Sequence, residues 1–410
     1  MKRRSFLAAT GGSIAAGAIS SLVPAAARAA ATVWQPAELP EGTIASAVLE
    51  ALPGKSPLLK RSYRPPNFET PIEYFRTPFT PNNAFFVRWH LGDIPKVDLR
   101  TWKLKLGGAA TSRPLELDMA AIKRDFEHVE LAAVCLCSGN RRGMFQPHVP
   151  GVEWGIGAMG NARWKGVRLR ELLNRAALKP GAIEVAFNGA DRGVFPATPD
   201  FVKSIPIERA LDENTLIAFE MNGKPLPHHN GFPARLVVPG WTGTYWMKQL
   251  TDIDVRTTAQ GGFWMNPAYR LPAGRFPNAD RFPTQETQAN TPITDIVVSS
   301  LVTSIRDGAR FRPGQSVDVS GIAWDGGRGI REVQVSTDAG QTWQASQLGR
   351  DYGRFSFRQF SYRFKPAKDG VYLVMVKAFN NRGDTQTMEL VHNPAGYHHN
   401  VVERIMIEVV

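Results

Sequence analysis

The sequence predicts an α+β domain followed by an all-β immunoglobulin-like sandwich. Residues 81 to about 285 mix strand-like runs, such as IEVAFNG and ARLVVPG, with the helix-like run VRLRELLNRAAL. Apolar residues at helical spacing give that run one buried face, namely Val167, Leu169, Leu172, Leu173 and Ala176. Beyond residue 290, short alternating runs (QSVDVSGIAW, REVQVST, VYLVMVKAF) are separated by Gly-containing turns, a pattern typical of a sandwich.

The domain boundaries follow from changes in composition. Residues 31 to 80 are Pro-rich and predict an irregular, extended arm that covers the next domain, so we assign residues 31–285 to one unit. The polar segment NADRFPTQETQANTPITD predicts a linker before a second unit at residues 290–410. A chain of 410 residues is long enough for two such cores.

The first 30 residues are typical of a twin-arginine export signal. They combine Arg3 and Arg4, an uncharged stretch from Ser5 to Ala27, and a small-residue cleavage site around Ala29. An uncleaved membrane anchor is the alternative, and no later segment resembles a membrane span. We therefore expect a periplasmic protein, exported folded with a bulky prosthetic group and without a stable membrane span after cleavage.

The net charge of +12 is spread along the chain. It favours an anionic substrate or an acidic partner, but no Lys/Arg run of the kind that binds nucleic acid occurs. We expect no nucleic-acid partner.

Both cysteines of the chain, Cys135 and Cys137, lie in VCLCSGNRRG. A disulfide between residues two apart on a strand would be strained, and no C-x-x-C-H motif for covalent haem occurs. Two thiols without histidines at finger spacing also disfavour a structural zinc site. The preceding HVELAAV predicts a buried strand, which places Cys137 at its end. A thiolate beside two arginines suits a soft metal next to an anion.

Four ordered motifs resemble the sulfite oxidase family. CSGNRRG resembles its molybdenum-ligating segment, and FFVRWH resembles its arginine-x-histidine motif. GAMGNARWKGVRLRELL and FEMNGKPLPHHNGFPARLVVPGWTG resemble two further signatures. The resemblance implies the sulfite oxidase fold, a molybdopterin-binding domain, and a C-terminal domain at a homodimer interface.

The resemblance also implies roles for individual residues. Cys137 matches the molybdenum ligand, and Cys135 has no matching role, so we interpret it as a core residue. Adjacent His228 and His229 are interpreted as loop residues and not as a shared metal site. The matched catalytic residues are Arg88, Arg142, Tyr269 and Trp154, and the matched molybdopterin-binding residues are His90, Asp191, Asn230, Arg235 and Lys248.

The implied reaction is oxidation of sulfite to sulfate at an oxo-molybdenum centre, with electrons passed singly to a c-type cytochrome. This chain carries no haem motif, so the acceptor is expected to be separate, and a dedicated haem subunit is an alternative. One departure is Ala395, which stands where animal members have an arginine of the substrate pocket. The alternatives are sulfane-sulfur dehydrogenation or methionine sulfoxide reduction on the same scaffold, and a non-enzymatic protein that binds an extracellular anion.

Overall fold

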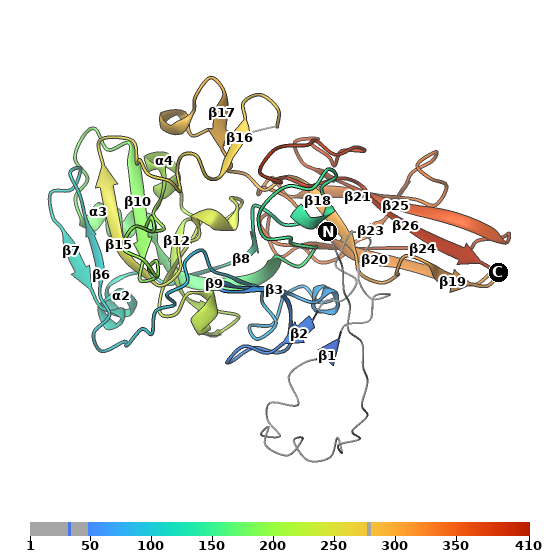
Figure 1. The fold of residues 1–410 in the computed structure, drawn as a ribbon, viewed down its shortest axis with the longest axis horizontal. Coiled ribbons are helices and arrows are strands. Elements are labelled where there is room, and N and C mark those ends of the chain that lie inside the picture. Colours follow the sequence, from blue (N-terminus) through green and yellow to red (C-terminus); the bar gives the residue numbers. More distant parts are fainter. Residues whose placement is uncertain (1–31, 34–47, 277–279) are drawn as a thin grey trace, which may run out of the picture.

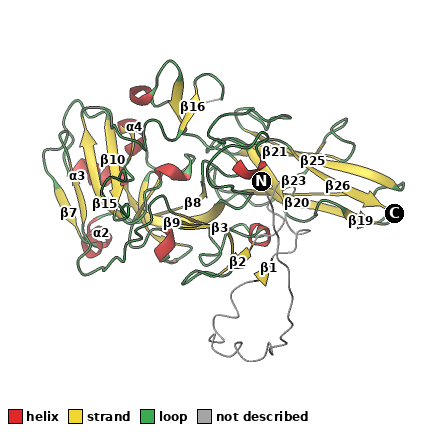
Figure 2. Ribbon diagram, viewed as in Figure 1, coloured by secondary structure: helices red, strands yellow, loops and turns green. Residues whose placement is uncertain are grey.

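The computed structural model describes residues 32–33, 48–276 and 280–410. The proposed export signal and part of the arm lie outside these ranges. Two regions are visible in Figure 1: one holds the strands from β6 to β15, and the other holds those from β18 to β26. Strands dominate both regions and the helices are short, as Figure 2 shows, so the first unit contains less helix than an α+β prediction suggests.

The segment before the first large domain forms a sheet of its own. Its strands follow the chain in order: β1 (Thr32–Val33), β2 (Val48–Glu50), β3 (Leu58–Tyr63), β4 (Pro66–Glu69) and β5 (Val87–Arg88). The prediction of an irregular arm was wrong for its described part, because β3 and β4 pair as an antiparallel hairpin. The carboxylate of Glu69 accepts bonds from the backbone N–H groups of Gly155 (2.5 Å) and Gly157 (3.0 Å). These bonds join this sheet to the loop that follows the cysteines.

Two further sheets form the body of the first region. One has the order β11 (Lys203–Pro206), β10 (Glu184–Gly189), β15 (Leu250–Arg256), β6 (Leu104–Gly107) and β7 (Leu115–Leu117). The other has the order β13 (Lys224–Pro225), β12 (Leu216–Met221), β9 (Met159–Arg168) and β8 (Val129–Leu136), with β14 (Arg235–Val237) also on β12. The predicted strand before the cysteines is therefore confirmed as β8.

The described part of the chain contains the helices α2 (Met119–Asp125), α3 (Leu169–Arg175) and α4 (Ile207–Ala210), with 3-10 turns η2 (Ile72–Phe75), η3 (Arg142–Met144), η4 (His228–Asn230), η5 (Gly243–Tyr245) and η6 (Pro283–Gln285). The predicted helix near residue 170 is α3, whose Leu169, Leu172 and Leu173 are buried. Val167 was wrongly included, because it pairs with Ile217 as part of strand β9. None of the helices described combines the length and apolarity that a membrane crossing requires.

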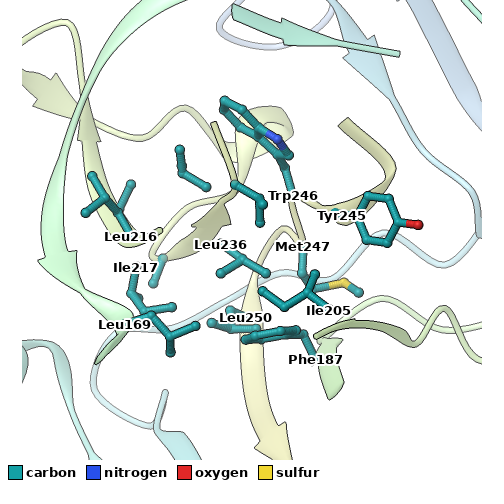
Figure 3. Close-up of a cluster of buried hydrophobic side chains, with 14 of the residues drawn as sticks. Leu169, Phe187, Ile205, Leu216, Ile217, Leu236, Tyr245, Trp246, Met247 and Leu250 are labelled. Atoms are coloured by element: carbon teal, nitrogen blue, oxygen red, sulfur yellow. The ribbon is translucent and has the colours of Figure 1, made fainter. Parts of the chain in front are cut away.

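One apolar core joins these sheets to α3. Figure 3 shows side chains from both sheets converging on this core. Removing the apolar surface of such side chains from water is the main favourable term in folding. The labelled members are Leu169, Phe187, Ile205, Leu216, Ile217, Leu236, Tyr245, Trp246, Met247 and Leu250. Trp246 and Met247 immediately precede Lys248, so this packing fixes the backbone of the site described below.

The predicted linker is more structured than its composition suggests. Over its described part it contains η6 and β17 (Asn290–Pro292), which pairs with β16 (Arg270–Pro272). The Arg270 guanidinium donates to the backbone oxygen of Gln285 (2.5 Å), which holds the segment against the first region.

The C-terminal region consists of two sheets around a shared core. One has the order β18 (Ser299–Val302), β20 (Val317–Trp324), β24 (Arg358–Phe364) and β23 (Gln347–Leu348), and the other β19 (Ala309–Phe311), β26 (Glu403–Val409), β25 (Gly370–Asn380), β21 (Ile330–Ser336) and β22 (Gln344–Ala345). Buried residues of both sheets, such as Val319 and Val376, belong to one cluster. The predicted strands are confirmed, and the immunoglobulin-like topology stays a prediction.

Candidate functional site

The two cysteines lie where a strand meets a cavity. Cys135 is in β8 and Cys137 follows its last residue, so both side chains fall on one face. Both are free thiols and both line a cavity of about 650 Å³. Burial raises the pKa of Cys135 to about 11, which keeps that thiol protonated and supports its interpretation as a core residue. Cys137 is the thiol at the strand end, where side chains can reach a ligand.

Hydrogen bonds fix the loop that carries Cys137. Its backbone N–H donates to the oxygen of Ala158 (2.9 Å), and the Asn140 side-chain oxygen accepts from the N–H of Ala158 (3.0 Å). The Arg141 N–H donates to the oxygen of Gly155 (2.7 Å). The loop is therefore held against the start of β9, which is the next strand of the sheet.

Arg88, the last residue of β5, and His90, two residues after it, reach the same cavity. Val87 and Trp89 are buried, and strand alternation turns Arg88 and His90 to the opposite face, where both line the cavity. The His90 ring stacks on Phe201 with 3.7 Å between ring centroids, and its Nε2 contacts the Tyr269 hydroxyl. Burial, followed by the charge of Arg88, lowers the pKa of His90 well below its usual value, so this imidazole is neutral.

Tyr269 lines the cavity opposite the cysteine strand. It has a φ of 60°, a left-handed conformation that non-glycine residues rarely adopt and that clusters at functional sites. Its ring stacks on that of Tyr397 (5.8 Å between centroids), and the ammonium of Lys203 lies 5.1 Å from its centroid. Burial raises the pKa of Tyr269, so the phenol is protonated.

A group of cations and polar side chains lines the rest of the cavity. The Arg235 guanidinium lies between the rings of Trp164 and Trp246 (5.1 and 5.6 Å from their centroids). Lys248 is buried, and its Nζ lies 3.1 Å from the centroid of the Trp89 ring. Within the described ranges, neither Lys248 Nζ nor Arg235 Nε has a hydrogen-bond partner.

Two other predicted cofactor residues behave differently from these cations. Asp191 is buried in the cavity wall, where burial raises its pKa against the opposing effect of Lys248. The amide of Asn230 is already engaged, because its nitrogen donates to Phe86 oxygen (3.0 Å) and its oxygen accepts from Lys55. Asn230 therefore helps to hold the cavity wall in place, and its hydrogen-bonding groups are largely used within the protein.

Arg142 and Trp154 lie beside the cavity without being part of its lining. The Arg142 Nε donates to the Ala395 oxygen (2.9 Å), and its guanidinium lies 5.2 Å from the centroid of the Tyr397 ring. Trp154 is fully buried, and its indole N–H has no partner among the described residues. Arg142 is thus oriented by the C-terminal segment, and it reaches the site next to the stacked Tyr397 and Tyr269.

Glycine makes room for Arg142. A Cβ atom at Gly139 would lie 2.6 Å from the Arg142 Cζ, and one at Gly396 would lie 2.7 Å from its Cγ. Real Cβ atoms essentially never approach so closely, and Gly396 also has a φ of +62°. A larger residue at Gly139 must displace the guanidinium itself, and one at Gly396 must displace Val149 or the stem of Arg142.

Sequence reasoning missed several lining residues. His229 lines the cavity and accepts from the Trp89 indole N–H (3.2 Å), and no motif pointed to Phe201 or Thr244. The pair His228–His229 had been noticed, but alternation on an extended chain did not apply, since both residues lie in η4. Within the described ranges, no group of three or more His, Cys, Asp or Glu side chains could hold a metal ion.

A molybdenum-pterin group fits this cavity. The thiol of Cys137 is a soft ligand. Lys248 Nζ and Arg235 Nε are buried donors without partners among the described residues, and such donors suit an anion such as a phosphate. Buried donors without partners are rare in folded proteins, so a ligand with acceptor oxygens would complete the site.

Comparison with known proteins gives a consistent result. The family described as an oxidoreductase molybdopterin-binding domain matches residues 91–264, and the Mo-co oxidoreductase dimerisation domain matches residues 290–410. Sulfite oxidase of Gallus gallus is 35% identical over 326 residues, which cover 77% of this chain and 69% of that protein. The chain belongs to the sulfite oxidase family.

Other members of the sulfite oxidase family show the extent of the similarity. The mitochondrial sulfite oxidase of Homo sapiens is 36% identical over 305 residues, which is 72% of this chain. The chain spans only about half of that protein (54%). The crystal structure of the sulfane dehydrogenase SoxCD from Paracoccus pantotrophus aligns with a TM-score of 0.73 at 22% identity, covering 97% of this chain and 94% of that one, and so shares its fold.

Proposed function

We propose that this chain is a periplasmic sulfite dehydrogenase, which oxidises sulfite to sulfate and passes electrons singly to a c-type cytochrome. The observation that carries the proposal is the meeting of Cys137, Arg88 and Tyr269 in one cavity, two of whose buried donors, Lys248 Nζ and Arg235 Nε, lack partners among the described residues. The molybdenum-pterin group, when bound, supplies oxygen-atom transfer and accepts two electrons, chemistry that side chains cannot provide.

Each side chain then has a distinct task. Arg88 and Arg142 attract and orient the sulfite dianion, because guanidinium groups are permanently charged and can hold an oxyanion with two bonds. Lys248 and Arg235 anchor the phosphate of the pterin. The protonated Tyr269, held by neutral His90, donates a hydrogen bond towards the bound substrate.

Substrate choice is decided by a steady-state comparison of sulfite, thiosulfate and methionine sulfoxide, together with elemental analysis of the purified protein. Cytochrome c and an artificial oxidant serve as acceptors for the first two, and a reduced dye serves as donor for the third. We expect molybdenum in the protein and the highest kcat/KM with sulfite. A preference for a sulfane-sulfur substrate would replace the proposal, and protein without molybdenum would support simple anion binding.

The proposed assembly is a homodimer formed through residues 290–410, the part that matches a dimerisation domain. The first 30 residues support export by the twin-arginine pathway. Fractionation of cells and light scattering on the holoenzyme test these two points. A heterodimer with a haem subunit is the alternative to the homodimer, and co-purifying haem would reveal it.

Replacing Tyr269 with phenylalanine is expected to lower kcat with sulfite about tenfold, which corresponds to one lost hydrogen bond of about 1.4 kcal/mol. The aromatic stack with Tyr397 is retained, so the lost contact with His90 should lower the free energy of unfolding by only about 1 kcal/mol. Steady-state kinetics and thermal melting provide the measurements. Tyr245→Phe is the matched control, since its buried hydroxyl has no partner among the described residues and does not line the cavity. Equal kcat values for the two variants would contradict the role of Tyr269.

Replacing Gly396 with alanine is expected to raise the KM for sulfite about tenfold. The new Cβ would lie 2.5 Å from Val149 Cγ2 and 2.7 Å from Arg142 Cγ, so both side chains must shift, and the shift of Arg142 weakens one charge-assisted contact. Gly383→Ala is the control: it has a φ of +93° but no atom within 4 Å of the added Cβ, so it carries the backbone strain alone. A KM change of equal size in both variants would assign the effect to strain and not to Arg142.

A further inference from the structure

A second cavity adjoins the loop that carries Cys137. It lies between this loop and the C-terminal region, and its empty space, open solvent included, is about 300 Å³. Ser138 and Asn140 line it from the loop, and Trp324, His398 and His399 line it from the C-terminal region. None of these residues has a task in the function proposed above.

Three polar atoms of this second cavity lack partners. Ser138 Oγ, His398 Nε2 and His399 Nδ1 are buried, and no hydrogen-bond partner exists for them in the described part of the chain. Buried polar atoms are nearly always paired with protein or with ordered water. Three such atoms around one small space require polar partners that the described residues do not supply, and the proposal below assigns water to this role.

Packing fixes the two imidazole rings. His398 lies against Phe276 and His399 against Phe145, with 5.3 and 5.6 Å between ring centroids. His398 also has a φ of 55°, which is rare for a residue with a side chain. Burial lowers the pKa of both rings to about 3. A neutral imidazole carries one N–H and one lone pair, so each ring can accept and donate a hydrogen bond at the same time.

The second cavity has walls in common with two other spaces. Ser138 also lines the cavity that holds Cys137. His399 also lines a groove of about 1970 Å³ that includes open solvent, together with Glu403 and the exposed Arg404. The Glu403 carboxylate accepts a bond from the Val302 N–H (2.7 Å) in the groove wall. Ser138 and His399 therefore stand at the two boundaries of the second cavity, one shared with the Cys137 cavity and one shared with the solvent-open groove.

We propose that Ser138, His398 and His399 form a path for water and protons between the Cys137 cavity and the groove at Glu403. The inference rests on the proposed function. Oxidation of one sulfite consumes one water and yields one sulfate, two protons and two electrons. The electrons pass to two one-electron acceptors of the c-type cytochrome class, whereas the protons must reach solvent and a water must enter. The path carries both without crossing the substrate-binding arginines.

The first test is structural and does not depend on activity. A high-resolution crystal structure of the holoenzyme is expected to show ordered water within hydrogen-bond distance of His398 Nε2 and His399 Nδ1. A dry cavity would overturn the path. Because this result needs no turnover, it stands even if sulfite proves not to be the substrate.

The second test is kinetic. His399→Phe fills the wall with an apolar ring, and we expect kcat with sulfite to fall about tenfold, a modest effect for a lost proton-transfer group, while KM is unchanged. The solvent deuterium isotope effect on kcat should increase. His399→Gln keeps a hydrogen-bonding group, so its kcat should fall less than that of His399→Phe. If the phenylalanine variant does not fold, the glutamine variant is measured in its place.

His392→Phe is the matched control for these variants. His392 packs on the same Phe145 ring (5.8 Å between centroids), but it bonds the Pro147 oxygen and lines neither the second cavity nor the groove. It should have the kcat and isotope effect of the wild type. If both His399 variants also match the wild type while sulfite is oxidised normally, the path is wrong and the proposed function stands. If the wild type does not oxidise sulfite, the proposed function fails. The presence or absence of ordered water in the second cavity then tests the path on its own.

Discussion

Replacing Cys137 with serine is expected to abolish sulfite-dependent cytochrome c reduction, leaving less than about one-hundredth of wild-type activity. A hydroxyl is a much harder and less acidic ligand than a thiol, and even groups that only support a metal ligand change activity 10- to 100-fold when lost. X-ray absorption spectroscopy of the loaded variant should show one sulfur fewer around molybdenum.

Cys135→Ser is the control for this experiment. Cys135 lines the same cavity, two residues away on the same face, but its Sγ lies 3.9 Å from an Arg235 nitrogen and its thiol is kept protonated by burial. This variant should retain the molybdenum–sulfur signature and most of the activity. Near-normal activity in Cys137→Ser, or loss of the sulfur signal in Cys135→Ser instead, would show that the ligand has been misassigned.

Replacing Lys248 with methionine is expected to change stability and cofactor binding in opposite directions. Its ammonium is buried without a hydrogen-bond partner among the described residues, and burial lowers its pKa well below the usual value. Methionine removes the free-energy cost of burying an unpaired charge. The melting temperature of the cofactor-free variant should therefore rise, on the order of 2 °C. It also removes the phosphate contact, so the molybdenum-pterin group should dissociate about 10- to 100-fold more readily. Thermal melting of cofactor-free protein and molybdenum content after dialysis measure the two effects.

Lys55→Met is the matched control for a buried lysine. Lys55 Nζ donates to the backbone oxygens of Asn82 (2.7 Å) and Phe85 (3.0 Å), and it also contacts the Asn230 amide oxygen. Its loss leaves these acceptors unpaired, so the melting temperature should fall. If Lys248→Met destabilises the cofactor-free protein as Lys55→Met does, then Lys248 is a structural residue and not an anion-binding one.

Local pattern was enough to predict part of the site. A buried apolar run ending at a turn predicted that Cys137 lies at a strand end, and β8 ends one residue before it. Arg88 and His90 were assigned by the resemblance of FFVRWH to a family motif, and both line the cavity, Arg88 at the end of β5 and His90 two residues later. The family resemblance then assigned Lys248 in YWMKQL and Tyr269 in FWMNPAYRLP, two stretches outside the four motifs, and both residues line the cavity with Cys137.

Other features depend on contacts between distant segments, which local pattern does not contain. Apolar spacing could not separate Val167 at the end of β9 from the first turn of α3, because both are buried by the same core. The Pro-rich arm was misjudged because Pro65 and Pro66 lie at the hairpin between β3 and β4, where proline is tolerated. The position of Arg142 depends on Ala395, some 250 residues away in the chain.

Arg142 is positioned by contacts with Ala395, Gly396 and Tyr397 of the C-terminal region. These contacts bear on whether the first region can act without the second. A truncated chain ending near residue 285 would keep the thiol and the buried lysine, yet it would lose the carbonyl and the ring that aim the guanidinium. Such a fragment could carry the prosthetic group and still handle its substrate poorly. On the proposed role of Arg142, we therefore expect exchange of C-terminal modules between relatives to alter selectivity, even when every ligand of the first module is left untouched.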